Sequence, residues 1–123
     1  MASKILLAED EEHLGKMVQF KLERAGYQVI WKQDGLTAWD CIRQERPDLI
    51  ILDVMMPGLD GFQVLERIRA QASTSATPVL MLTAYAQQSQ IEQGIQTGAS
   101  DYMSKPFKPA ELLSRVRRLL KEG

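Results

Sequence analysis

The sequence predicts an α/β fold in which helices cover both faces of one parallel β-sheet. The first observation is residues 47–53, where four consecutive aliphatic residues between two prolines have the pattern of a strand buried on both faces. The second is that similar short runs alternate along the chain with segments whose apolar residues recur at helical spacing. The third is that these runs end in polar residues, at the edge where open α/β sheets bind ligands.

Five strands and five helices are expected in alternation. The strands are expected at residues 5–8, 27–31, 47–53, 78–83 and 101–104. Apolar stripes predict helices that end before Gly26, span residues 36–44, follow Gly61, span about residues 87–97 and begin at Pro109. Asp34-Gly35 predicts a turn. The helix at 87–97 has a poor apolar stripe and should be among the least stable elements.

The order of these elements predicts the topology. Short alternating strand and helix units give a parallel sheet with right-handed crossovers and helices on both faces. At a length of 123 residues, we expect one flavodoxin-like (βα)5 domain over residues 1–123, with the strand order 2-1-3-4-5. The ligand crevice of that arrangement lies at the carboxyl ends of strands one and three, which carry Glu9, Asp10 and Asp53.

Composition and charge exclude several classes of protein. The net charge of -1 gives no overall positive field, so direct binding of nucleic acid is not expected. Cys41 is the only cysteine, which excludes a disulfide framework and favours a reducing compartment. The first apolar run is too short for a signal peptide or a membrane span. We therefore expect a cytoplasmic protein that does not bind membranes, with no output domain within this chain.

Five polar side chains are expected to meet at one edge of the sheet: Glu9, Asp10, Asp53, Thr83 and Lys105. Asp53 alone is as well explained as a turn or cap residue. Bare carboxylates about 4 Å apart, however, repel by roughly 4 kcal/mol at an effective dielectric constant near 20, so something must offset that charge. Carboxylates with a backbone carbonyl suit Mg²⁺, and a lysine supplies a second cation. The set therefore suits phosphoryl transfer, with a nucleophile, a metal, a cation and a hydrogen-bond donor.

The motifs around these residues resemble a known family. They are the acidic pair Glu9-Asp10, Asp53 followed by residues 55–61 (MMPGLDG), Thr83-Ala84, and residues 102–107 (YMSKPF). Together they closely resemble the receiver domain of bacterial two-component response regulators, in order and with the right separations over the whole chain. The C-terminal part is most similar to receivers of winged-helix transcriptional regulators.

The resemblance implies a phosphorylation-dependent signalling switch. Asp53 is the implied phosphoacceptor, and a histidine kinase is the implied phosphodonor. Glu9, Asp10, Asp53 and the backbone carbonyl of Met55 are the implied ligands of Mg²⁺. Glu9 stands where the family more usually has aspartate, and its longer arm allows it to reach the metal through water.

Further roles follow from the same resemblance. Thr83 and Lys105 are the implied pair that grips the phosphoryl oxygens after transfer. Tyr102 is the implied aromatic switch that turns inward as Thr83 moves, although a simple half-buried aromatic explains it equally well. Lys105-Pro106 is the implied cis peptide, since X-Pro bonds reach cis at low cost. The surface of the fourth helix, the fifth strand and the last helix would then act on an output protein or an attached DNA-binding domain.

Two side chains flank the reaction line in the family and tune the lifetime of the phosphoryl group. Here they are Met55, two residues after Asp53, and Tyr85, two residues after Thr83. Neither carries a carboxylate or an amide that could orient water. We therefore expect slow self-dephosphorylation, which a half-life of seconds would refute.

The resemblance also indicates a surface for a homodimer that forms on phosphorylation. Asp101, Glu111, Arg115 and Arg117 resemble the charged dimer face of receivers attached to winged-helix domains. The Gln-rich segment at 87–97 lacks the basic residues that this face needs opposite Glu111, so the sequence does not decide whether such a dimer forms.

Other functions remain as alternatives. A degenerate receiver would fold but act as an interaction module without phosphorylation. An aspartate-based phosphatase needs a second aspartate two residues after the nucleophile, where this chain has Met55. A flavin-binding module needs a loop rich in Ser, Thr and Gly after the first strand, where residues 9–12 are all acidic and would repel a phosphate.

Overall fold

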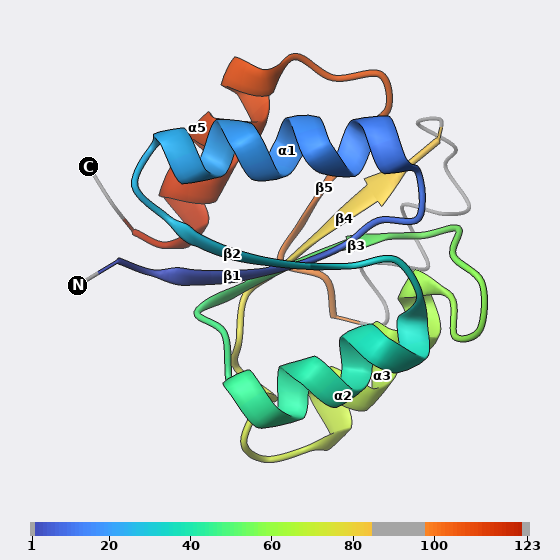
Figure 1. Ribbon diagram of the computed structural model, residues 1–123. Helices are drawn as coiled ribbons and strands as arrows, with labels where there is room; N and C mark the ends of the chain where they lie inside the picture. Colours follow the sequence, from blue (N-terminus) through green and yellow to red (C-terminus); the bar gives the residue numbers. More distant parts are fainter. Residues whose placement is uncertain (1, 85–97, 122–123) are drawn as a thin grey trace.

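The computed structural model describes residues 2–84 and 98–121, which contain five strands and four helices (Figure 1). In chain order they are β1 (Lys4–Ala8), α1 (Glu12–Arg24), β2 (Gln28–Lys32), α2 (Gly35–Glu45), β3 (Leu49–Asp53), α3 (Gly61–Ala70), β4 (Val79–Thr83), β5 (Asp101–Ser104) and α5 (Pro109–Leu119). The helix expected at about residues 87–97 and the side chain of Tyr85 lie outside the described residues. No helix in the described part of the chain has the length and apolar character needed to cross a membrane.

The strands form a single parallel sheet in the order β2-β1-β3-β4-β5, which confirms the predicted topology. Ala8 of β1 pairs with Leu52 of β3, and Asp53 pairs with Leu82 of β4. The carboxyl ends of β1, β3 and β4 therefore meet at the same edge of the sheet (Figure 1). Every residue of β3 is buried, as expected for the central strand.

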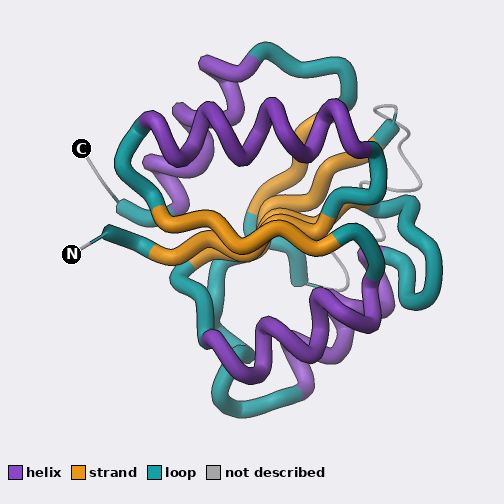
Figure 2. Tube along the Cα trace, in the orientation of Figure 1, coloured by secondary structure: helices purple, strands orange, loops and turns teal. Residues whose placement is uncertain are grey.

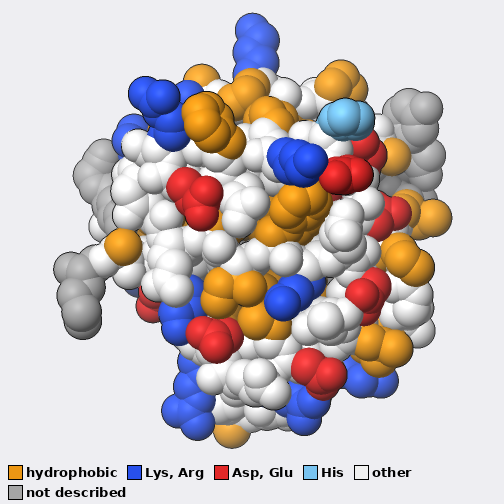
Figure 3. Space-filling view, in the orientation of Figure 1, with side chains coloured by type: hydrophobic (Ala, Val, Ile, Leu, Met, Phe, Trp, Pro, Cys, Tyr) orange, Lys and Arg blue, Asp and Glu red, His pale blue; other side chains and the backbone are white. Residues whose placement is uncertain are grey.

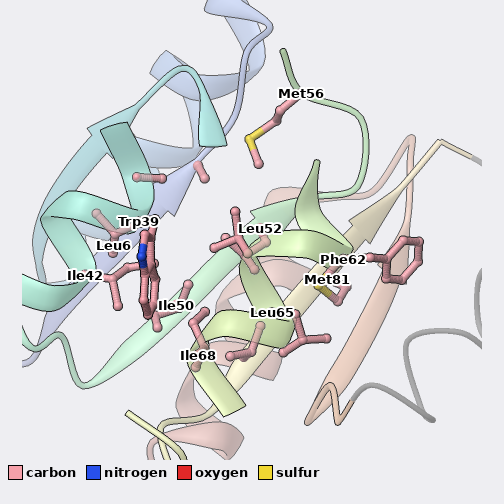
Figure 4. Close-up of a cluster of buried hydrophobic side chains, with 14 of the residues drawn as sticks. Leu6, Trp39, Ile42, Ile50, Leu52, Met56, Phe62, Leu65, Ile68 and Met81 are labelled. Carbon is pink, nitrogen blue, oxygen red and sulfur yellow. The ribbon is translucent and has the colours of Figure 1, made fainter. Parts of the chain in front are cut away.

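Helices cover both faces of the sheet. Helices α1 and α5 lie on one face, and α2 and α3 lie on the other (Figures 1 and 2). Alternate residues of the central strands point to opposite faces, so two separate apolar clusters form. Figure 4 shows part of the cluster under α2 and α3, which includes Leu6, Trp39, Ile42, Ile50, Leu52, Met56, Phe62, Leu65, Ile68 and Met81.

Aspartates cap the N-termini of α2 and α3, the two helices that share one face of the sheet. Asp60 and Gln63 form a capping box at the start of α3. Asp34 accepts hydrogen bonds from the N–H and hydroxyl of Thr37 and caps α2. The turn predicted at Asp34-Gly35 is therefore wrong, because the same Asp-Gly pair can begin a helix when the aspartate faces its first free N–H groups.

The end of α1 was placed correctly from Gly26. This glycine follows the helix with a φ of +100°, a conformation that L side chains rarely adopt. The following strand begins one residue later than expected. The N–H of Tyr27 donates to the carbonyl of Leu22 at 3.2 Å, which closes the helix end before β2 starts at Gln28.

Candidate functional site

Four strand ends place the predicted site residues together. Asp53 is the last residue of β3 and is only 3% exposed. Glu9 follows β1 directly, Thr83 ends β4, and Lys105 follows β5, whose Ser104 pairs with Thr83. The N–H of Lys105 donates to the carbonyl of Thr83 at 2.7 Å, which holds the start of the following loop against β4.

Three carboxylates form the acidic part of this site. Oxygens of Glu9, Asp10 and Asp53 all lie within 4.8 Å of one another. Glu9 and Asp53 are buried, whereas Asp10 is exposed to solvent. Hard oxygen donors at this spacing, open to water on one side, have the composition of a Mg²⁺ site.

Lys105 bridges the two buried carboxylates. Its Nζ donates to Asp53 Oδ2 at 2.9 Å and lies 3.0 Å from Glu9 Oε1. The sequence placed Lys105 at this edge as a second cation, and the structure gives it both Asp53 and Glu9 as partners. One ammonium group therefore partly neutralises both carboxylates.

The side chain of Glu9 is fully buried and incompletely satisfied. Its Oε2 accepts a hydrogen bond from the N–H of Glu11 at 2.9 Å. Its Oε1 is paired with the ammonium of Lys105 at 3.0 Å, and no other partner of this oxygen is found among the described residues. A carboxylate oxygen can accept more than one contact, so Oε1 can also bind a cation or a water molecule. The residues present therefore fit a divalent cation.

The electrostatics of the site favour the binding of positive charge. Burial raises the pKa of Glu9 to about 7, against the N–H of Glu11 and the ammonium of Lys105, and the charge of Asp53 adds to the rise. Burial also raises the pKa of Asp53, although Lys105 opposes this. Burial alone would lower the pKa of Lys105, but its contacts with Asp53 and Glu9 raise it. An added cation would favour the ionised form of both carboxyl groups.

The loop after β3 holds the other oxygen of Asp53. The N–H of Met55 donates to Asp53 Oδ1 at 3.3 Å. The side chain of Met55 is 64% exposed at the rim of the site. Gly61, the first residue of α3, lies so close below that an added Cβ would stand 2.3 Å from the carbonyl oxygen of Asp53. Gly61 therefore allows α3 to begin directly beneath the end of β3, a close approach that the sequence did not reveal.

Comparison with known proteins agrees with this geometry. The family model described as the response regulator receiver domain matches residues 5–117. The chain belongs to the receiver domain family of response regulators. It is 45% identical over 123 residues to the alkaline phosphatase synthesis transcriptional regulatory protein PhoP of Bacillus subtilis, and the match covers all of this chain and 50% of that protein. The chain thus spans about half the length of the curated relatives it matches.

Solved receivers share the fold over nearly their whole length. The chemotaxis response regulator CheY4 of Vibrio cholerae is 34% identical, with a TM-score of 0.92 and coverage of 97% of this chain and 99% of that one. The receiver domain of the sensor histidine kinase PA1611 of Pseudomonas aeruginosa is 35% identical, with a TM-score of 0.91 and coverage of 99% and 100%. That structure contains a magnesium ion coordinated in its active site cleft.

The two residues predicted to act as a switch lie in the neighbouring strands β4 and β5. Thr83 is buried at the end of β4. Tyr102 in β5 is partly buried and packs against the cluster under α2 and α3. The peptide bond between Lys105 and Pro106 is cis.

The predicted dimer face is only partly gathered in one place. Arg115 donates to Asp101 at 3.1 Å and to Glu111 at 3.2 Å, so these three residues form one network between β5 and α5. Arg118, which was not assigned to the dimer face from the sequence, donates to Asp101 at 2.6 Å. Arg117 lies elsewhere, in a groove between α1 and α5, because residues 115 and 117 point in different directions from one helix.

One contact with the acidic turn was missed entirely. The indole Nε1 of Trp31, in β2, donates to the backbone carbonyl of Glu9 at 2.9 Å. No role at the site was predicted for Trp31 from the sequence, since large side chains in strands usually pack against the core. No spacing rule relates a strand residue to a carbonyl on the neighbouring strand end, so the sequence held no signal for it.

Proposed function

We propose that this receiver is a phosphorylation-dependent switch of a two-component system, in which a histidine kinase is the phosphodonor and Asp53 accepts the phosphoryl group. The observation that carries the proposal is the buried carboxylate of Asp53, paired with Lys105 and placed beside Glu9 and Asp10 at the sheet edge. Membership of the receiver family supports the same function.

The transfer is a displacement at phosphorus. A carboxylate oxygen of Asp53 attacks the phosphorus of a phosphohistidine, the new O–P bond forms, and the P–N bond to the imidazole breaks. Lys105 lies 2.9 Å from Asp53 Oδ2 and is placed to hold a phosphoryl oxygen once the carboxylate has become an acyl phosphate. The hydroxyl of Thr83 on the neighbouring strand is the proposed donor to a second phosphoryl oxygen.

Glu9, Asp10 and Asp53, with the backbone carbonyl of Met55, are the proposed protein ligands of Mg²⁺. The bound ion would supply positive charge that offsets the charge of the phosphoryl oxygens. This chain supplies the buried, paired nucleophile and the acidic rim. Among the described residues, the buried Oε1 of Glu9 has only the ammonium of Lys105 as a partner, so it can also bind the ion directly or through water.

The resulting acyl phosphate should be long-lived. The exposed side chain of Met55 stands at the rim two residues after Asp53, and a thioether cannot orient a water molecule for attack. Self-dephosphorylation of the purified protein should therefore take many minutes or longer, measured as the decay of phosphoprotein after the donor is removed. A half-life of seconds would contradict this.

A groove beside the site is suited to the phosphodonor. Leu14 and Met17 of α1 and Phe107 after β5 line a largely apolar groove of about 530 Å³, which Lys105 borders. A kinase that carries a phosphohistidine must place it within bonding distance of Asp53, and this groove offers an apolar resting surface next to that position. Leu14→Ala should slow transfer from a kinase at least about tenfold. It should leave transfer from a small acyl phosphate unchanged, and an equal loss with both donors would contradict a docking role.

Phosphorylation is proposed to change the surface that includes β5 and α5. Movement of Thr83 and Tyr102 would alter the neighbouring network of Asp101, Glu111 and Arg115. That network is the proposed contact with an output protein or domain, or with a second copy of the chain.

The proposal is tested with Mg²⁺ and beryllofluoride, which mimics an aspartyl phosphate. Tryptophan fluorescence and light-scattering mass should be recorded for the wild type and for Asp53→Asn. A Mg²⁺-dependent change that is lost in Asp53→Asn supports the switch, and a doubled mass supports dimerisation. Absence of any response, with Mg²⁺ binding also absent, would indicate a degenerate receiver that acts by its surface alone.

A further inference from the structure

We propose that Trp31 is a positioning residue that holds the acidic turn in its metal-binding shape and thereby sets the affinity for Mg²⁺. The inference rests on the proposed Mg²⁺ site. Trp31 belongs to β2 and lies outside the set of carboxylates, yet its indole N–H donates to the carbonyl of Glu9 at 2.9 Å. It therefore acts on the backbone from which the acidic side chains project.

The backbone of Glu9 is held by β2 at both of its polar groups. Its N–H donates to the carbonyl of Lys32 at 3.0 Å, and its carbonyl accepts from Trp31. That carbonyl belongs to the rigid peptide plane between Glu9 and Asp10. Fixing its direction fixes the plane, and with it the point from which the exposed carboxylate of Asp10 begins.

The indole is itself held in place by helix α1. A Cβ built on Gly15 would lie 2.1 Å from Cζ2 of Trp31, so the ring rests directly on the helix backbone. The N–H of Gly15 donates to the carbonyl of Glu11 at 2.9 Å, and Glu11 caps the same helix. The ring therefore packs against Gly15 in the first half of α1 and hydrogen-bonds to the turn of residues 9–11.

A purely structural role for Trp31 makes a different prediction. Trp31 also packs at the edge of the cluster under α1 and α5, so its removal should lower stability in either case. Only a positioning role requires the Mg²⁺ affinity of the folded protein to change. Groups that orient metal ligands from outside the coordination sphere typically contribute 10–100-fold to metal affinity.

The test measures Mg²⁺ binding by calorimetry in the absence of any phosphodonor. Trp31→Phe keeps an aromatic ring and loses the N–H, and a benzothiophene in place of the indole at Trp31 keeps the shape as well. Both should bind Mg²⁺ about tenfold more weakly than the wild type. Trp39→Phe is the matched control, because Trp39 is buried in the opposite cluster, and its Mg²⁺ affinity should not change.

A double-mutant cycle tests whether Gly15 acts on Mg²⁺ binding through its contact with Trp31 or through a general loss of stability. Gly15→Ala should displace the indole and weaken Mg²⁺ binding in the wild type. In the Trp31→Val background, where the ring is absent, the same substitution should have no further effect. Equal effects in both backgrounds would contradict the proposed coupling.

The outcomes are distinguishable. Unchanged Mg²⁺ affinity in folded Trp31 variants, with only the urea midpoint lowered, would overturn the positioning role and leave the metal site intact. Failure of the wild type to bind Mg²⁺ at all would overturn the proposed metal site together with this inference.

Discussion

The chemistry of the site depends on how a few residues share charge. Lys105 lies within 3.0 Å of both Glu9 and Asp53, and the carboxyl pKa of Glu9 is raised to about 7 from an ordinary value of 4.5. At neutral pH the carboxyl of Glu9 in the metal-free site is therefore close to half protonated. Burial raises the pKa of Asp53 as well, and a bound cation would favour the ionised form of both carboxyl groups.

Mg²⁺ binding should weaken as the pH falls below about 7. A proton on Glu9 competes with the metal, so the apparent affinity should drop by up to about tenfold per pH unit below that pKa. Calorimetric titrations between pH 5.5 and pH 8.5 would measure this. Glu9→Gln, which cannot titrate, should lose most of the dependence, and an unchanged pH profile in that variant would contradict the assignment.

The stability of the metal-free protein should change in the opposite sense. The carboxyl of Glu9 binds its proton more tightly in the folded protein than in the unfolded chain, so between pH 4.5 and about 7 the folded state holds more protons. The free energy of unfolding should therefore decrease as the pH rises through this range. Urea unfolding without Mg²⁺ would show the decrease, and added Mg²⁺ should reduce it.

Removal of Lys105 should cost much more than removal of a surface cation. Lys105→Gln leaves two buried carboxylates facing each other and should lower the free energy of unfolding by about 2–3 kcal/mol at pH 8. Arg118→Gln removes an exposed partner of Asp101 and should cost less than about 1 kcal/mol. Similar costs for the two variants would show that the paired charges at the site are effectively solvated.

The residues differ in how well the sequence predicted them. Asp53, Glu9 and Lys105 were brought together correctly, because the carboxyl ends of parallel strands share one edge. The contact of Trp31 with the Glu9 carbonyl was missed, because it depends on one side-chain direction. The place of Arg117 in the α1–α5 groove was missed as well, because the family pattern grouped it with Arg115.

At the level of elements, close approaches of the backbone shape the site. Helix α3 begins eight residues after β3 ends, and the N–H of Gly61 donates to the carbonyl of Val54 at 2.9 Å. The backbone of Gly61 lies so close to the end of β3 that any side chain at this position would push against the carbonyl of Asp53.

Gly61→Ala should therefore affect both folding and phosphorylation. The new Cβ would stand 2.3 Å from the carbonyl of Asp53, so we expect a loss of about 2–4 kcal/mol and slower phosphorylation. Gly26→Ala is the control, since nothing lies within 4 Å of its Cβ and only the positive φ is strained. It should cost about 1 kcal/mol and leave phosphorylation unchanged. Equal phosphorylation rates in the two variants would contradict the role of Gly61.

The type of an element was predictable where its apolar residues formed a regular helical stripe or an uninterrupted aliphatic run. The apolar stripe of α5 and the aliphatic run of β3 placed both elements correctly, within two residues. Asp34-Gly35 was assigned to a turn, whereas in the structure it begins α2. The same pair of residues occurs in turns and at helix starts, and only the tertiary path of the chain decides between these two structures. The segment at 87–97 is not described, so its predicted helix stays a prediction.

On the scale of the whole molecule, the site lies at the carboxyl edge of the sheet, and the charged network joins the start of β5 to α5. The face that Figure 3 shows has acidic and basic side chains interspersed, without one dominant sign. The network of Asp101, Arg115 and Glu111 is paired within the chain, so a dimer that uses it must exchange internal contacts for contacts between copies. Dimerisation should accordingly weaken as salt rises, which light scattering of the beryllofluoride form would measure.

The most direct test of the proposed function is the phosphorylation of Asp53 itself. The purified protein would be incubated with a small acyl phosphate, with and without Mg²⁺, and its intact mass and peptide map recorded. We predict that one phosphoryl group is added only when Mg²⁺ is present, that it maps to Asp53, and that Asp53→Asn does not acquire it. A phosphoryl group on another residue, or none in a wild type that binds Mg²⁺, would contradict the assignment of Asp53 as the phosphoacceptor.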